Sequence, residues 1–329
     1  LLYIRGKMFA VSPVLADPLF SITSQSMFIQ LTRKRLTFER TIHRFMVGGE
    51  RESIYVVWSW VHAKAAAKNK SKKSSSVIYS TMANYIFARF GFIDSVKQFT
   101  GADVIVGDDD ITYAKYPKKD WVICASIGVR PSARTSKIDI YRPPTLKVAV
   151  RKSQFTKEVK NLIGSFFYIV DHFPDRIDVD NVNDPWIWRV VLGHIIYEAG
   201  TSEGLMVNEI QDHLNSIDEY IDAIVIKRLE TAGHSFTTIY ELFMYVINYL
   251  SQPSISDGSY ESSMYNKQLT TLRYLMYDIV AEINQLMFDL RNSTKKRKEL
   301  DETQINSIFN ARLRNDLITR ITRHSKHPE

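Results

Sequence analysis

The sequence predicts an α+β protein that is predominantly helical, with a basic amino-terminal half, a small antiparallel sheet at about 101–150 and an all-α carboxy-terminal half. Two observations support this class. Short β-branched runs separated by turn residues lie between 101 and 152, as expected for strands. Apolar residues at helical spacing dominate on both sides of that segment. The 329 residues, 45% of them apolar and 24% charged, have the composition of a folded protein.

The first predicted helix covers residues 25–46. Its apolar side chains share one stripe at 3.6-residue spacing: Leu31, Phe38, Ile42 and Phe45. Three arginines share the opposite stripe and are candidate phosphate contacts: Arg33, Arg40 and Arg44. Gly48 and Gly49 end this helix, and a second helix with Trp58 and Trp60 is predicted to follow. We therefore expect a helix that packs on one side and presents guanidinium groups on the other.

A lysine-rich segment follows at 64–76. It contains five lysines, no acidic residue and no apolar residue larger than alanine, so we expect its serine-rich end to be mobile. Four of its lysines are candidate nucleic-acid contacts: Lys68, Lys70, Lys72 and Lys73. A third helix is predicted at 77–99, where aromatic side chains recur.

Residues 101–152 predict four or five antiparallel strands, DVIV, ITYAKY, WVICASI, KIDIY and LKVAV. The loops between them are basic and carry seven candidate phosphate contacts: Lys115, Lys118, Lys119, Arg130, Arg134, Lys137 and Arg142. Aromatic residues lie beside these cations, and Tyr116 and Trp121 are the candidate stacking residues. Because cations neutralise phosphates and flat rings stack on unpaired bases, this mixture favours single-stranded nucleic acid.

From residue 153 onward the sequence predicts helices at about 154–172, 185–199, 203–231, 236–251 and 260–291. The last of these carries a heptad-like seam: Leu269, Leu272, Met276, Ile279, Ile283, Leu286 and Leu290. Such a seam fits either the central core helix of a helical domain or the contact of a homo-oligomer. The basic segment 293–303 then leads into a final predicted helix at 304–326.

Charge is unevenly distributed along the chain, whose formal net charge is +7. Residues 1–152 contain 25 Lys/Arg and 11 Asp/Glu, residues 153–290 contain 8 and 20, and residues 291–329 contain 10 and 5. This distribution predicts a basic nucleic-acid-binding domain, an acidic helical domain and a basic helical tail with those boundaries. We expect the acidic domain to bind a basic protein, such as a polymerase subunit, or the basic half of a second copy.

The acidic turn that begins at Gly107 is typical of the metal-binding turn of a polymerase palm, with Asp108 and Asp109 as ligands. A palm also needs an aspartate from a preceding strand, and none fits. Asp175 and Asp180 have the Asp-x₄-Asp spacing, but they follow the turn and lie in a predicted loop. We therefore favour a four-residue hairpin connection. A permuted, metal-dependent nucleotidyl-transfer enzyme stays an alternative.

No glycine-rich phosphate loop, nucleophile elbow or EF-hand is found, so we predict no catalytic residue, no metal and no cofactor. The single Cys124 and the lack of an apolar run of about 18 residues favour a cytoplasmic protein without membrane contact, in the host cytoplasm if it is viral. The leading hypothesis is a non-enzymatic accessory protein for replication or transcription that binds single-stranded DNA or RNA, possibly from a virus or phage. The main alternative is a structural virion protein that oligomerises through 260–290.

Overall fold

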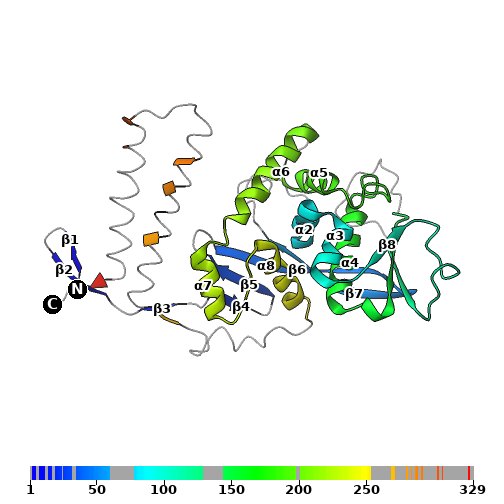
Figure 1. Cartoon of the computed structure of the whole chain (residues 1–329), viewed down its shortest axis with the longest axis horizontal. Helices are drawn as coiled ribbons and strands as arrows, with labels where there is room; N and C mark the ends of the chain where they lie inside the picture. Colours follow the sequence, from blue (N-terminus) through cyan, green and yellow to red (C-terminus); the bar gives the residue numbers. More distant parts are fainter. Residues whose placement is uncertain are drawn as a thin grey trace, which may run out of the picture.

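The computed structural model describes residues 2–4, 7–11, 14–16, 19–23, 25–31, 35–59, 78–128, 144–197, 201–252, 268–270 and 325–326, with isolated positions between 279 and 306. Its largest element is a seven-stranded antiparallel sheet (Figure 1). The strands are β4 (Phe20–Ile22), β5 (Ser26–Gln30), β6 (Arg35–Val47), β7 (Glu50–Ser59), β8 (Val104–Gly107), β9 (Trp121–Ala125) and β10 (Lys147–Arg151).

The long strand β6 joins two parts of this sheet. The strand order is β4-β5-β6-β9-β10-β8, and β7 pairs with β6. Residues 35–39 of β6 pair with β5, whereas Met46 and Val47 pair with β9. One 13-residue strand therefore carries the amino-terminal hairpins at one end and the β8–β9–β10 part at the other.

Seven helices are described in the chain, together with a 3₁₀ turn, η1 (Lys152–Gln154). The helices are α2 (Met82–Phe90), α3 (Phe92–Thr100), α4 (Lys157–His172), α5 (Pro185–Ile196), α6 (Glu203–Asp218), α7 (Ala223–Thr231) and α8 (Ile239–Leu250). Helix α4 packs on β6 and β7, α8 packs on β5, β6 and β7, and α2 lies against α4, α5 and α8. Helices α5 and α6 lie on the far side of α2 from the sheet (Figure 1). One hydrophobic core contains residues from Leu19 to Leu250.

Two smaller sheets use strands close to the chain ends. Strand β2 (Lys7–Val11) pairs with β1 (Leu2–Ile4) and with β12 (Ser325–Lys326). Strand β3 (Val14–Ala16) pairs with β11 (Gln268–Thr270). Segments from the two ends of the sequence are therefore hydrogen-bonded to each other.

The predicted helix at 25–46 is wrong, because this segment forms β5 and β6. Strand β6 buries Leu36 and Phe38 in its first half but Phe45 and Val47 in its second half. Phe38 packs against Phe243 of α8, with ring centroids 6.2 Å apart. The second half packs against α4, where the rings of Phe45 and Phe167 stack with centroids 5.9 Å apart. Because the buried side changes from even to odd positions, the apolar spacing imitates a helix, although the structure is a strand.

Gly48 and Gly49 form the two-residue turn of the β6–β7 hairpin and do not end a helix. Val47 pairs with Glu50, and both glycines have positive φ, 63° and 96°. Positive φ at both central residues is the requirement of a type I′ hairpin, which glycine meets without steric cost. The predicted second helix after these glycines is therefore also wrong, because residues 50–59 are strand β7.

The predicted fold class is contradicted at three points. The sheet extends from residue 20 to residue 151 and is not a small sheet confined to about 101–150. Within 101–152 three strands are described, because ITYAKY forms turns and KIDIY lies outside the described residues. The predicted all-α carboxy-terminal half contains β11 inside the supposed long helix at 260–291 and β12 at the end of the supposed final helix.

Local interactions explain the helices that were predicted correctly. Helices α4, α5, α6 with α7, and α8 lie within the four segments predicted as helical between 154 and 251. Thr156 caps α4, and Asp184 followed by Pro185 begins α5, as expected from the preferences of first-turn residues. The helix predicted at 77–99 is divided into α2 and α3 at Gly91, where φ is 84° and a Cβ atom would collide with the carbonyl oxygen of Asn183.

Candidate nucleic-acid interface

A tight turn at residues 117–120 places two lysines at the start of β9. The backbone N–H groups of Asp120 and Trp121 both donate to the carbonyl oxygen of Pro117, at 3.0 Å. The N–H group of Lys152 donates to the carbonyl oxygen of Asp120 at 2.8 Å, which joins the turn to the end of β10. Lys118 and Lys119 are exposed at the tip of this turn. The turn is therefore held at both ends while its lysine side chains extend into solvent.

Trp121 lies beside these lysines and is paired across the sheet with Arg151. The Cζ atom of Arg151 lies 5.3 Å from the centroid of the Trp121 ring, within the range of a cation–π contact. Tyr116 meets the same ring edge-on at a centroid distance of 5.0 Å. Tyr116 is itself buried with Ile111 and Ile123 in a small second core. The indole ring therefore contacts both Arg151 and Tyr116, yet it stays partly exposed.

These residues define a basic surface that we call the Trp121 cluster: Lys118, Lys119, Trp121, Arg151 and Lys152. All four cations are exposed. Within the part of the chain that the structure describes, no acidic side chain forms an ion pair with Lys118 or Lys119. Nearby Asp103 has its pKa lowered, first by a hydrogen bond from Lys97 and to a smaller extent by Arg151. Lys118 and Lys119 are therefore the two cations of the cluster that are best able to contact a polyanion.

The structure places the other predicted contacts in different surroundings. Arg40 donates from Nη1 to the carbonyl oxygens of Leu250 and Gln252, at 3.1 and 2.6 Å, so it joins β6 to the end of α8. Arg44 is exposed on the same strand. Lys115 donates to a carboxylate oxygen of Asp110 at 3.2 Å. Nine predicted contacts lie outside the described residues: Arg33, Lys68, Lys70, Lys72, Lys73, Arg130, Arg134, Lys137 and Arg142.

Sequence reasoning missed Arg151 and Lys152. Both directly follow the apolar run LKVAV, so a strand end could have been inferred for them. What places them beside Trp121 is the antiparallel register of β9 and β10, which pairs Arg151 with Trp121. That register joins residues 30 positions apart, and no local pattern reports it.

The acidic turn at 107–110 lies at the surface, and its Asp109 side chain is fully exposed. It is not a hairpin connection as predicted, because β8 pairs with β10 and not with the segment that follows the turn. Thr145 Oγ1 donates to Asp108 at 2.6 Å, Lys147 lies 3.7 Å from Asp109, and Lys115 binds Asp110. The backbone of Gly107 passes too close to the Asp110 side chain for any Cβ atom. Each carboxylate therefore has a partner from the protein.

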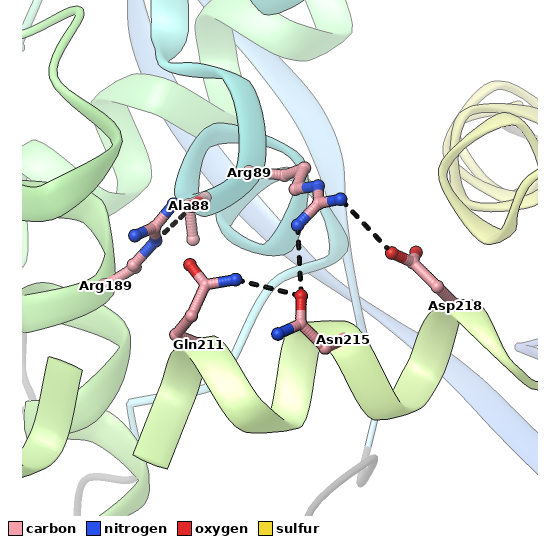
Figure 2. A network of polar contacts seen from close by, with 6 residues as sticks. All are labelled: Ala88, Arg89, Arg189, Gln211, Asn215 and Asp218. Atoms are coloured by element: carbon pink, nitrogen blue, oxygen red, sulfur yellow. Dashed lines mark hydrogen bonds and ion pairs between the residues drawn. The ribbon is translucent and has the colours of Figure 1, made fainter. Parts of the chain in front are cut away.

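A network of polar contacts fixes helix α6 on α2 (Figure 2). The Arg89 guanidinium at the end of α2 donates to Asn215 Oδ1 at 3.3 Å and lies 3.5 Å from Asp218. Gln211 donates to the same oxygen of Asn215 at 2.9 Å. Arg189 of α5 donates from Nε to the carbonyl oxygen of Ala88 at 2.9 Å, so three helices meet at the carboxy-terminal end of α2.

A buried pair of titratable groups lies between β6 and α4. His43 Nε2 is 3.6 Å from Asp171 Oδ2, and burial favours the neutral form of each group. Burial raises the pKa of Asp171 to about 7 and lowers the pKa of His43 to about 3, with a further decrease from nearby His172. No cluster of three or more His, Cys, Asp or Glu side chains within the described residues could hold a metal ion.

A family model of RNA polymerase subunits matches residues 1–326, almost the whole chain. The chain belongs to the family of non-virion RNA polymerase subunits, so its function is viral and related to transcription. A search of the curated proteins finds no match. In the described part of the chain, no helix is long and apolar enough to cross a membrane.

Proposed function

We propose that this polymerase subunit is a non-enzymatic accessory protein that holds single-stranded nucleic acid on the Trp121 cluster. The observation that carries the proposal is the pairing of a partly exposed Trp121 with Arg151, next to two lysines that no described acid neutralises. Lysine and arginine bind phosphates without regard to sequence, and an aromatic ring adds about 1–3 kcal/mol for each stacked base. Duplex bases already stack on one another, so this surface favours an unpaired strand.

The accessory role is supported by the acidic turn. A nucleotidyl-transfer site would need carboxylates able to bind two metal ions at the transferring phosphate. In this turn Asp108, Asp109 and Asp110 are engaged by Thr145, Lys147 and Lys115, respectively. The family match also favours a transcription role over the alternative of a virion scaffold.

The experiment is equilibrium binding of 3′-labelled single-stranded and duplex oligonucleotides to the purified chain across a salt series. The proposal predicts tighter binding of the single strand and a linear fall of log affinity with log salt concentration. Equal affinity for the two forms, or an affinity that does not change with salt, would reject it.

A second proposal concerns protein partners, which for a polymerase subunit include other subunits of the polymerase. Helix α6 exposes Leu205, Glu209 and Asp212 at spacings of four and three residues, which places them on one face. An acidic face with an exposed leucine suits a basic polymerase subunit. Glu209→Lys with Asp212→Lys should reduce co-purification with the other polymerase subunits, and unchanged recovery would exclude this face.

A further inference from the structure

A hollow of about 380 Å³ lies between strand β7 and the beginning of helix α4. Its lining combines two rings, two lysines and small polar groups: Ser53, Tyr55, Phe155, Lys157, Lys160 and Asn161. Ligand pockets commonly have volumes of about 300–1,000 Å³ and combine apolar walls with a few polar groups. The hollow is therefore large enough for a compact ligand with one flat part and one anionic part.

Tyr55, which lines this hollow, has its ring in contact with the guanidinium of Arg40. The Cζ atom of Arg40 lies 4.0 Å from the ring centroid. The same guanidinium is fixed by the carbonyl oxygens of Leu250 and Gln252. Residue Ser251, between these two, also lines the hollow. Tyr55 is thus positioned before any ligand arrives, which reduces the entropy lost on binding.

The two lysines differ in their partners. Lys160 forms an ion pair with Glu52 of β7, so part of its charge is neutralised. Lys157 is exposed at the first position of α4, and no described acidic side chain forms an ion pair with it. Asn161, which is only 3% exposed, lies one helical turn further and donates to Asn248 at 3.5 Å. Lys157 is therefore the cation best able to meet an anion at this hollow.

The hollow is connected to the Trp121 cluster through a short segment. Strand β10 ends at Arg151, η1 covers Lys152–Gln154, and Phe155 then lines the hollow. The N–H group of Phe155 donates to the carbonyl oxygen of Lys152 at 3.3 Å, which keeps this segment compact. Cations from Arg151 to Lys157 thus extend from the cluster to the hollow.

We propose that the hollow binds one nucleotide unit, with the base beside Tyr55 and Phe155 and the phosphate at Lys157. The unit is either a free nucleoside triphosphate or the 5′-phosphorylated end of a strand, since both offer a base and an anionic phosphate. The second source rests on the proposed function, whereas the first is independent of it. Stacking on the two rings and a charge-assisted contact at the lysine together supply the affinity.

The experiment uses the full chain and two probes, ATP and a 3′-labelled decamer carrying either a 5′-phosphate or a 5′-hydroxyl group. The variant is Lys157→Glu, and the matched control is Lys227→Glu, an exposed lysine on α7. We expect Lys157→Glu to weaken binding of ATP, or of the 5′-phosphorylated decamer relative to the 5′-hydroxyl decamer, about tenfold or more. Lys227→Glu should change neither affinity, and equal thermal unfolding of both variants would establish that they are folded.

The outcomes separate the two proposals. Loss of ATP binding in Lys157→Glu supports a free nucleotide, and it does so even if wild-type chain binds no strand. A selective loss for the 5′-phosphorylated decamer supports a strand end. If wild-type chain binds strands but neither binds ATP nor distinguishes the 5′-phosphate, the hollow is not a nucleotide site, although the Trp121 cluster still binds nucleic acid. An equal loss in Lys157→Glu and Lys227→Glu also overturns the inference.

Discussion

Two tight turns of opposite charge lie at opposite ends of strand β10. The acidic turn at 107–110 follows β8, whose last residue, Gly107, pairs with Lys147. The basic turn at 117–120 precedes Trp121, which pairs with Arg151 at the other end of β10. The acidic turn attracts attention in the sequence because it resembles a catalytic motif. We propose that the basic turn, and not the acidic one, binds a ligand.

The difference lies in whether the charges have partners inside the protein. The carboxylates of the acidic turn are engaged by Thr145, Lys147 and Lys115. Lys118 and Lys119 form no ion pair with any acid in the described part of the chain. A charge that is already paired must lose that partner before it can bind a ligand, whereas an unpaired one does not. A charged motif is therefore best judged by the groups that already surround it.

The largest expected effect comes from reversing the charge of the basic turn. Lys118→Glu combined with Lys119→Glu removes two phosphate contacts and adds repulsion. We expect single-strand affinity to fall by roughly a hundredfold at low salt, because each charge-assisted contact contributes about 1.5–3 kcal/mol. The slope of log affinity against log salt should become shallower by about 1.4, at about 0.7 per single-strand phosphate contact. Fluorescence anisotropy titrations at several salt concentrations measure both quantities.

The control for that variant is Lys227→Glu, the same type of replacement at one exposed lysine of α7, with half the change in net charge. It should leave both the affinity and the slope within about twofold of wild type, since single surface charges are strongly screened. An equal loss in both variants would mean that overall charge, and not the basic turn, governs binding.

The second effect isolates stacking from charge. Trp121→Ala should reduce single-strand affinity about tenfold, because one stacked base contributes about 1–3 kcal/mol. Its salt slope should stay unchanged, since no phosphate contact is lost. Trp186→Ala is the matched control, because Trp186 is a 43% exposed tryptophan on α5, outside the cluster. A changed slope in Trp121→Ala, or an equal loss in Trp186→Ala, would count against stacking at this position.

The third effect concerns the acidic turn and is close to zero. Replacing Asp108, Asp109 and Asp110 by asparagine should change strand affinity by less than about twofold. The turn lies across the length of β10 from Trp121, and a five-residue strand is about 16 Å long, beyond the Debye length of about 10 Å at 0.1 M salt. Titration of the triple variant measures this affinity. Manganese-dependent nucleotide incorporation by wild type that disappears in the variant would instead restore the enzyme hypothesis.

The smallest effect is a dependence of stability on pH. The hydrogen bond from Lys115 holds the pKa of Asp110 below its usual value. A lowered folded-state pKa stabilises the fold above the unfolded-state value of about 4, and this contribution is lost as the pH falls through the folded-state value. The free-energy difference between wild type and Asp110→Asn in urea unfolding should therefore shrink as the pH falls from 6 to 2. A difference that grows instead would contradict the assigned ion pair.

Local signals predicted the helices between 154 and 251 but not the amino-terminal strands. Capping by Thr156 and the Asp184-Pro185 start are local features of the sequence. The buried side of β6 changes halfway along the strand, so its apolar spacing fits a helix better than simple alternation. The Gly48-Gly49 pair was the available signal, because two glycines are typical of a two-residue hairpin turn.

The candidate site was predictable only where its residues are neighbours in the sequence. Lys118, Lys119 and Trp121 are neighbours in sequence, so their combination of charge and aromatic surface could be recognised directly. Arg151 and Lys152 join them only through the pairing of β9 with β10. The sequence also could not indicate that Arg40 would support Tyr55 and bind the end of α8, since those residues lie up to 212 positions away.

The most direct test of the central claim is photocrosslinking of a 4-thiouridine RNA decamer to the full chain, followed by trypsin digestion and mass spectrometry. Trypsin cleaves after Lys119 and Arg134 but not at the Arg130–Pro131 bond, so Trp121 lies in the peptide 120–134. The account predicts that this peptide carries the dominant crosslink and that excess unlabelled single strand suppresses it. Crosslinks confined to peptides outside the Trp121 cluster would contradict the account.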